Sequence, residues 1–367
     1  MPKTIRILEI ELMKAIAIIG MVYIHIFEMS LFIDEITSGT EFKIGVVLDF
    51  FGGIISGGAF MFAMGWGAAF SKGATPKSYV KRFFQLELYG ILVNLFQQWL
   101  PKLIDPESYG SLSEGWYSII AVDVYAFAGV CMLYFAVMKK LESNKPAKLI
   151  ISLLLLVICL IVNSLIPAES FSTGFDWLDT LIGLFIRENE YSYFPLVSWI
   201  AFPIAGYGAG KLFQTWKDLK KCYILLGVIG TVALVGGSVI MKVMGIPNAV
   251  IDPFNVSDLE YYALSTINVI TGVGLIAVEL VLASLLLKLT KGKLPNFVTD
   301  LSRNVMHIYI AQWLLIGLLS GLIAKTVHLI PIALLALGVL AISFLYAKAR
   351  EKKIATKIIQ KRFPNTK

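Results

Sequence analysis

Long apolar blocks separated by short polar segments make up most of this chain. Residues 149–167 contain only Ser152, Asn163 and Ser164 as polar residues, and residues 222–241 are similar. Crossing the hydrocarbon core of a bilayer, about 30 Å thick, takes roughly 20 apolar residues in a helix. Because no water is available there, each backbone N–H and C=O group must pair within its own segment. The blocks therefore predict an all-α fold, a polytopic membrane helix bundle.

About ten membrane spans are predicted from the blocks, each long enough to cross once. They lie near residues 12–33, 44–70, 84–104, 118–138, 148–167, 194–214, 222–243, 263–287, 303–323 and 326–347. The first block is too long for the apolar core of a cleavable signal peptide, and no small-residue cleavage site follows it. The sequence shows no internal repeat or low-complexity linker, so we predict a single membrane domain over residues 1–347 and a basic tail over residues 348–367.

The segments that connect the spans alternate in charge. One set holds 27 of the 32 lysine and arginine residues, and the other set is rich in aspartate and glutamate. The basic set comprises the N-terminal stretch through Lys14, residues 71–83, 139–148, 211–221 and 288–303, and the tail. Short cytoplasmic loops carry the lysine and arginine excess in membrane proteins. The pattern therefore predicts that both termini are cytoplasmic, in a multi-pass protein of the cytoplasmic (plasma) membrane.

Composition supports the same class. Hydrophobic residues make up 57% of the chain and charged residues only 16%, whereas soluble domains are about a quarter charged. The net charge of +7 is spread over several cytoplasmic segments, where anionic lipid headgroups or a phosphate-bearing cofactor attract it; no nucleic-acid partner is expected. Cys131, Cys159 and Cys222 have neither the pattern of a disulfide framework nor metal-ligand spacing, so no metal is expected.

Ionisable residues within a span are costly and mark candidate functional sites. Lys14 and His25 are eleven residues apart in the first span, which places them on one helix face, about 20° and roughly 16 Å apart. Glu28 follows one turn beyond His25 on the same side and could orient its imidazole, a frequent general base. Two interpretations of His25 stay open: a catalytic residue, or a side chain that only hydrogen-bonds a neighbouring helix.

Other polar residues fall within the predicted spans. Each can line a cavity, or can simply pack or pair with a lysine at a helix end. They are Asp49, Glu87, Asn94, Asp123, Glu279 and Gln312.

The first span carries a family-like motif. Glu11 precedes Lys14 by three residues, and His25 follows Lys14 by eleven. This pattern resembles the opening helix of the transmembrane acyltransferase superfamily, which includes acyltransferase-3 proteins of bacterial surface-glycan acylation and heparan-α-glucosaminide N-acetyltransferase-like proteins. In acyltransferase-3 proteins an arginine stands where this chain has Lys14.

Three later stretches resemble the same superfamily. Residues 60–65, followed by Lys81-Arg82, are similar to its second span and cytoplasmic turn. Residues 193–199, followed by a glycine-rich stretch, and residues 301–309, which contain Arg303, are similar to two further helices. Gln312 stands where a histidine is common in the family.

The resemblance implies a membrane-bound acyltransferase that takes an acyl group, most often acetyl, from cytoplasmic acyl-CoA. The acceptor is a hydroxyl or amine of a sugar, surface glycan or lipid-linked molecule. Lys14, Lys81, Arg82 and Arg303 would bind the cofactor. His25 would deprotonate the acceptor or carry the acyl group, and Glu28 would assist it.

Two other classes remain open at this point. A transporter or flippase would line a substrate path with the polar residues and would show paired halves or broken helices. A membrane assembly or lipid-binding protein would use them for packing alone. A homodimer is also left open.

Overall fold

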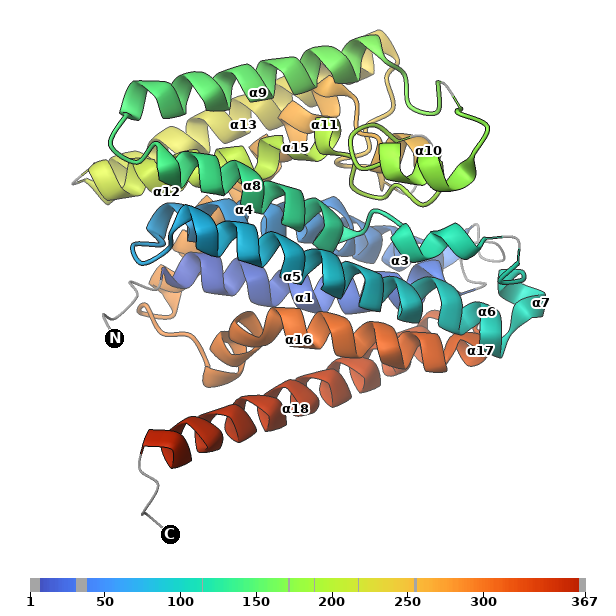
Figure 1. Ribbon diagram of the computed structural model, residues 1–367. Coiled ribbons are helices and arrows are strands. Elements are labelled where there is room, and N and C mark those ends of the chain that lie inside the picture. The colour runs from blue at the N-terminus through green and yellow to red at the C-terminus, as the bar shows by residue number, and fades with distance from the viewer. Residues whose placement is uncertain are drawn as a thin grey trace.

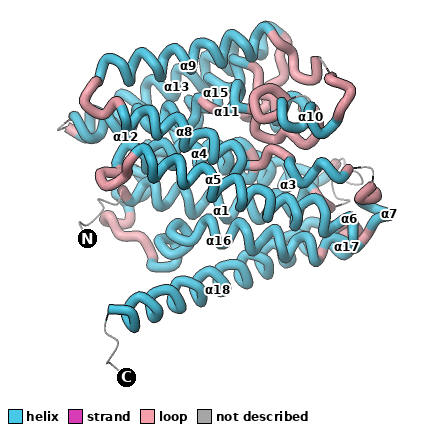
Figure 2. Tube along the Cα trace, in the orientation of Figure 1, coloured by secondary structure: helices cyan, strands magenta, loops and turns pink. Residues whose placement is uncertain are grey.

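The computed structural model describes residues 7–30, 38–113, 115–170, 172–187, 189–216, 218–253 and 256–362, with side chains to residue 353. In this part of the chain every regular element is a helix, and the helices run roughly along one direction in a bundle (Figure 1). Figure 2 shows that the remaining segments are short loops gathered at the two ends of the bundle. The predicted all-α membrane bundle is confirmed.

The helices have the following bounds: α1 Leu8–Glu28, α3 Gly39–Gly52, α4 Ile54–Phe70, α5 Pro76–Asn94, the π-helix η1 Leu95–Trp99, α6 Leu100–Ile104, α7 Pro106–Tyr109, the 3₁₀-helix η2 Trp116–Ile120, α8 Val124–Lys140, α9 Lys145–Leu165, α10 Asp176–Ile182, α11 Leu196–Trp199, α12 Ala201–Thr215, α13 Leu219–Met244, α14 Asp258–Tyr262, α15 Thr266–Leu289, α16 Asn296–Leu318, α17 Ser320–Ile323 and α18 Leu329–Arg362.

Seven helical segments of the described chain are long and apolar enough to cross a membrane. They are α1, α3 with α4, α9, α11 with α12, α13, α15 and the first part of α18. The other predicted spans correspond to α5 with η1 and α6, to α8 and to α16, which carry more polar residues or are shorter. The total of ten crossings therefore stays a prediction.

The two ends of the bundle differ in charge. The connections α4–α5, α8–α9, α12–α13 and α15–α16 lie at the same end as the start of α1 and the end of α18, on the left in Figure 1. These are the segments that hold most of the lysine and arginine residues. We call this the basic end and the other end, which carries α7, α10 and α17, the opposite end. The predicted charge alternation thus agrees with the fold, and the assignment of the basic end to the cytoplasm stays a prediction.

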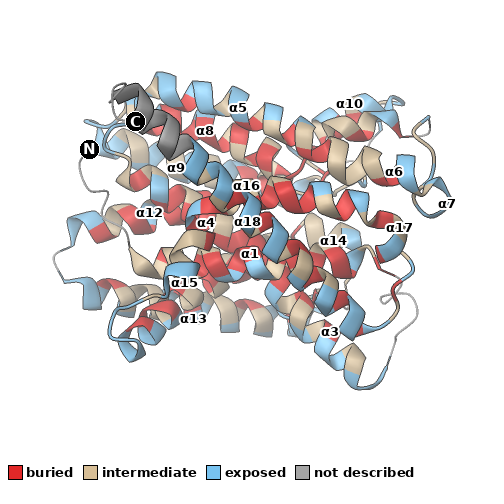
Figure 3. Ribbon diagram, turned by 90° about the horizontal axis from the view of Figure 1, so that it is seen from below, coloured by how far each residue is buried: buried red, intermediate tan, exposed pale blue. Residues whose placement is uncertain are grey.

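Buried residues concentrate in α1, α4 and α16 and in much of α8, α12 and α15 (Figure 3). In contrast, α9 and α13 are largely unburied although both are strongly apolar. An apolar helix face that is not covered by protein is suited to contact lipid tails. The arrangement is therefore a buried interior with outer helices whose apolar faces are suited to contact lipid.

Glycine allows the closest contact between helices. A Cβ atom added to Gly65 of α4 would lie 2.0 Å from the carbonyl oxygen of Pro203, and one added to Gly206 of α12 would lie 2.0 Å from that of Phe62. Small residues that let backbones approach are typical of helix contacts in membranes. The contact between α4 and α12 therefore requires glycine at both positions.

The last helix continues past the predicted limit between membrane domain and tail. α18 runs without a break from Leu329 to Arg362. At the basic end, Lys348 lies 3.0 Å from Asp300, and Glu351 lies 3.1 Å from Arg303. These ion pairs attach α18 to α16, and the domain limit at residues 347 and 348 stays a prediction.

We expect Gly65→Ala to lower the thermal midpoint of the purified protein, because the new methyl group meets backbone that cannot rotate away. Overpacking a well-packed contact costs about 1–3 kcal/mol. Gly67→Ala is the matched control, since a Cβ atom there meets open space. Equal thermal midpoints for the two variants would contradict the described α4–α12 contact.

We expect Ser170→Cys to react with a membrane-impermeant thiol reagent in intact cells and Lys293→Cys to react only after permeabilisation. Ser170 follows α9 at the opposite end and Lys293 precedes α16 at the basic end. The native cysteines Cys131, Cys159 and Cys222 are buried and give a low background. Equal labelling of both variants in intact cells would refute the predicted orientation.

Candidate active site

His25 lies in the second half of α1, on the wall of a cavity of about 260 Å³. We call it the inner cavity. Its wall comprises Met21, Ile24, His25, Glu28, Met29, Gly52, Gly53, Gly57, Gln97, Gln98, Tyr109, Asp123, Tyr193, Phe194, Trp199, Tyr261, Tyr262, Tyr309 and Trp313. Most of these groups are aromatic or small, and few carry charge. The inner cavity is therefore a partly apolar site with a small number of polar groups, as is usual for substrate sites.

The imidazole of His25 is held by three side chains of α16. Its Nδ1 atom lies 3.1 Å from the amide nitrogen of Gln312. The ring stacks on Trp313 with centroids 4.2 Å apart, and Tyr309 contacts it edge-on at 5.8 Å. These contacts fix the plane of the ring and occupy its Nδ1 edge. Within the described residues, Nε2 has no hydrogen-bond partner.

A second chamber of about 670 Å³ lies next to the inner cavity at the opposite end of the bundle. We call it the outer chamber. The two spaces share Glu28, Gln97, Gln98, Tyr109, Tyr193, Tyr261 and Tyr262 in their walls. Glu28 is exposed to this space, which explains how a carboxylate is tolerated at the end of a membrane helix. His25 is thus reached from the opposite end.

The two glutamines of the shared wall come from an irregular helix. In η1 the N–H of Leu100 donates to the carbonyl of Leu95, five residues earlier. Pro101 follows, and because it has no N–H it cannot bond to the carbonyl of Gln97, four residues earlier. Such π-helical turns occur often at functional sites. Here the turn places Gln97 and Gln98 on the cavity wall, and Gln98 donates to the Tyr193 hydroxyl at 3.0 Å.

Charged groups in the outer chamber are mostly acidic. They are Glu28, Asp49, Glu190 and Asp258, with Lys102 and Arg187 as the cations. Arg187 is buried, pairs with Glu169 at 3.4 Å and covers the Tyr262 ring at 5.3 Å. Burial, followed by the Asp105 carboxylate, raises the pKa of Tyr109 to about 12, so its phenol is a weaker acid than that of an ordinary tyrosine. The chamber combines aromatic faces with hydrogen-bonding groups.

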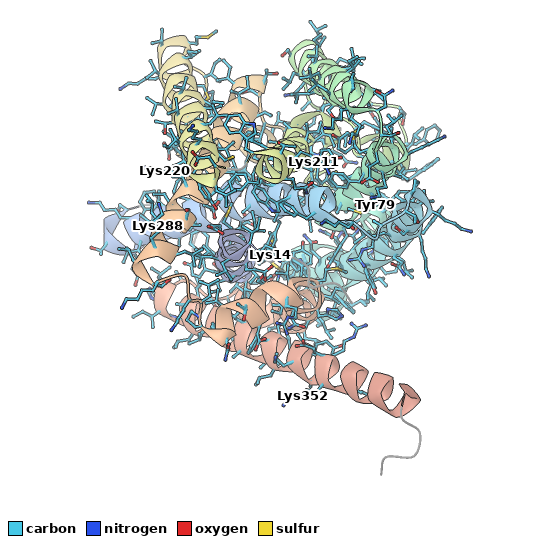
Figure 4. All side chains as sticks on the ribbon, turned by 90° about the vertical axis from the view of Figure 1, so that its left-hand side faces the viewer. Lys14, Tyr79, Lys211, Lys220, Lys288 and Lys352 are labelled. Atoms are coloured by element: carbon cyan, nitrogen blue, oxygen red, sulfur yellow. The ribbon has the colours of Figure 1, made fainter. Side chains whose placement is uncertain are left out.

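At the basic end, the first turns of α1 also contact α16. Lys14 lies 3.3 Å from Glu11 and donates to the carbonyl of Ser302 at 3.4 Å, and the Ser302 hydroxyl donates to Glu11. Figure 4 looks onto this end and places Lys14 near the middle of the bundle, with other lysines around it. Since Lys14 and His25 both contact α16, their predicted position on one helix face is confirmed.

The other predicted cofactor-binding residues lie at the basic end in two different environments. Lys81 and Arg82 are exposed, and no carboxylate of the described residues pairs with either. Arg82 reaches α16, where its guanidinium contacts the sulfur of Met306. Arg303 is bonded to Glu351 at 3.1 Å and lies 3.9 Å from Asp300. Its charge is already offset, whereas those of Lys81 and Arg82 are available.

Glu28 makes no described hydrogen bond to His25, whose ring nitrogen is bound by Gln312 instead. Glu28 does share the inner cavity with His25. The assisting role predicted for Glu28 stays a prediction.

The remaining polar candidates separate into different roles. Asp123 lines the inner cavity and caps α8 by accepting hydrogen bonds from the N–H groups of Tyr125 and Ala126. Its second carboxylate oxygen is buried and has no partner among the described residues. Asn94 binds two backbone carbonyls. Glu87 and Glu279 have buried oxygens without partners and do not line either space.

Sequence reasoning did not identify the shared wall. Gln97, Gln98 and three of the four tyrosines were not singled out, because none is charged at neutral pH or unusual in a span. Tyr193 was noted only as the first residue of a family-like stretch. The position of Pro101 after two glutamines was the available signal, since it predicts a break in helical hydrogen bonding. Gln312 was noted only as a buried polar residue.

Comparison with known protein families matches residues 7–348 to the family described as Acyltransferase domain. A search of curated proteins finds no match to the chain. The family match covers nearly all of the bundle, including α1 and α16, which carry the His25 site. The chain therefore belongs to this family of transmembrane acyltransferases.

Proposed function

We propose that this protein transfers an acyl group, acetyl in the simplest case, from acyl-CoA at the basic end to a hydroxyl or amine of a sugar or surface-glycan acceptor. The acceptor enters from the opposite end. The observation that carries the proposal is the environment of His25: its ring is fixed by α16, its Nδ1 edge is bound, and it lines a cavity that continues into the outer chamber. Family membership supplies the reaction class.

In the proposed reaction, Nε2 of His25 takes the proton of the acceptor hydroxyl as its oxygen attacks the thioester carbon. The carbon–sulfur bond then breaks, and the thiolate of CoA receives the proton from the imidazolium. The products are the acyl ester and free CoA. If His25 instead carries the acyl group, it attacks the thioester first; both routes need an unprotonated Nε2.

The outer chamber is suited to a polyhydroxylated acceptor. Tyrosine rings supply apolar faces with polar edges, and Gln97 and Gln98 supply amide donors and acceptors in the shared wall. The carboxylates of Asp49 and Asp258 add acceptors for hydroxyl donors. A sugar ring, which has both apolar faces and polar edges, matches this combination better than a wholly apolar molecule would.

The donor side rests on the basic end. Lys81 and Arg82 have free charge there, and Lys14 lies roughly 16 Å along α1 from His25 by helix geometry. The pantetheine arm of acyl-CoA would run along α1 and α16 between these residues. Arg303 would bind phosphate only by giving up its contacts with Asp300 and Glu351, so we assign it a smaller contribution to acyl-CoA binding than Lys81 and Arg82. Family membership favours this reaction over transport, lipid flipping or assembly.

We expect His25→Asn to slow acyl transfer severely and to leave folding intact. Asparagine retains a polar group but cannot accept a proton, and loss of a general base costs about a hundredfold to ten-thousandfold in rate. The measurement is release of free CoA by detergent-purified protein with a confirmed acceptor. His328→Asn is the matched control, because His328 is exposed and contacts Glu41 at the opposite end. Wild-type turnover in His25→Asn would refute the mechanism.

We expect the double variant Lys81→Gln, Arg82→Gln to bind acyl-CoA roughly twofold to thirtyfold more weakly, since each exposed charge contact contributes about 0.2–1 kcal/mol. The loss should shrink at high salt because exposed charges are screened. Isothermal titration with acetyl-CoA measures both effects. Lys220→Gln, Lys221→Gln removes two charges from α13 at the same end and serves as the control. Equal affinity in the two double variants would exclude the assigned site.

A further inference from the structure

Gln312 occupies an unusual position for an uncharged side chain. It is fully buried in α16, and its one described hydrogen bond joins its amide nitrogen to Nδ1 of His25. Its amide oxygen is buried and has no partner in the described part of the chain. A buried amide that leaves one end unpaired is costly. The contact with Nδ1 of His25 is therefore the one polar interaction that the described structure gives this side chain.

The contact between the two side chains determines which nitrogen of His25 carries the proton. A neutral imidazole has one N–H and one lone pair. When the amide NH₂ of Gln312 donates to Nδ1, the proton of His25 must be on Nε2, and the ring cannot accept a proton from the cavity side. When the amide oxygen faces Nδ1, it accepts from Nδ1–H, and Nε2 has a free lone pair.

The two ends of a carboxamide have nearly the same shape. A half turn of the amide exchanges its oxygen and nitrogen with little change in packing. The oxygen that now lacks a partner would then bind Nδ1–H at the 3.1 Å position. The same oxygen can accept from Nδ1–H after Nε2 has been protonated, so one orientation serves the neutral base and the imidazolium.

We propose that Gln312 is the positioning residue that holds His25 as the Nδ1–H tautomer before substrate binds, with its amide turned so that the oxygen faces Nδ1. The proposal rests on the proposed function, in which Nε2 is the reacting atom. Gln312 does not touch the acyl or acceptor group; it acts through His25. It does so without a charge, and the stacking of Trp313 keeps the ring from turning over.

Other ionisable groups near His25 are few. The inner cavity is lined by the carboxyl groups of Glu28 and Asp123 and by no lysine or arginine. Its tyrosines are Tyr109, Tyr193, Tyr261, Tyr262 and Tyr309. Gln312 is the side chain whose described hydrogen bond meets a ring nitrogen of His25, so a change at Gln312 acts on the tautomer directly.

The test combines spectroscopy with kinetics. The chain has three histidines, so protein labelled with [¹⁵N]histidine gives a simple spectrum in which protonated and unprotonated ring nitrogens are well separated, and His25→Asn identifies the His25 signals. We expect Nδ1–H in the wild type without substrate. Gln312→Met, similar in shape but unable to accept a hydrogen bond, should lose this tautomer preference and release CoA roughly tenfold to a hundredfold more slowly, the range seen for partners that orient metal-bound histidines.

Gln312→Glu tests rescue, because a carboxylate also accepts from Nδ1–H. It should retain the tautomer and most of the rate, and the acid limb of its rate profile should move to higher pH, since a negative charge favours the imidazolium. Gln214→Met is the control: Gln214 also bonds through its side-chain amide, but to Ala69 at the basic end.

Two results would overturn the proposal: an Nε2–H signal for His25 in the wild type, or a wild-type tautomer and rate in Gln312→Met. The spectrum is recorded without acyl-CoA or acceptor. Loss of the tautomer preference in Gln312→Met alongside wild-type turnover in His25→Asn would therefore reject the proposed catalytic function alone, and the two failures are distinguishable.

Discussion

The register between α1 and α16 is the constraint on which the site depends. The two helices start at the same end of the bundle, and polar pairs join them at two levels: Lys14 and Glu11 to Ser302, and His25 to Gln312. A slip of one turn, about 5.4 Å, would separate both pairs and leave their polar groups in apolar surroundings. Such groups cost more unpaired than they contribute when paired, so they specify the register more than they add stability.

The packing around this helix pair differs on the two sides of His25. Between His25 and the basic end, α1 and α16 are in contact through Lys14, Glu11 and Ser302. On the side of the opposite end, Gly53 lies between α3 and α4. A Cβ atom added to Gly53 would lie 2.2 Å from the hydroxyl of Tyr261. The backbone break thus makes room for the tyrosine wall. Near η1, a Cβ atom added to Gly317 of α16 would lie 2.4 Å from the carbonyl oxygen of Phe96. The inner cavity and the outer chamber extend from His25 toward the opposite end, where glycine and the π-helical turn create room.

How much of the fold and the site could be predicted from the sequence depends on whether a feature is set locally along the chain or by packing between distant segments. Apolar block length and loop charge are one-dimensional signals, and they predicted the fold class and the agreement between basic segments and one end of the bundle. The shared face of Lys14 and His25 followed from helix periodicity alone. The contact of His25 with Gln312 did not, because the two residues are 287 positions apart and only the packing of α1 on α16 brings them together. The π-helical turn at Leu95–Trp99 was also missed, since periodicity assumes regular helical bonding.

Arg303 illustrates the limit of a residue-by-residue comparison with a family. Its place in a family-like stretch predicted a phosphate contact, but α18 continues beyond the predicted membrane domain and brings Glu351 to its guanidinium. Cofactor binding at Arg303 would therefore have to replace an existing ion pair, whereas Lys81 and Arg82 need give up no carboxylate. Glu351 of α18 is also bonded by Asn304 of α16 and by Lys348 of its own helix, so the Arg303–Glu351 pair is part of the attachment of α18 to α16. A phosphate that drew Arg303 away would weaken the attachment of α18 to α16, the helix that holds His25. Under the proposed function, donor binding at Arg303 and the position of His25 would thus be connected through α16.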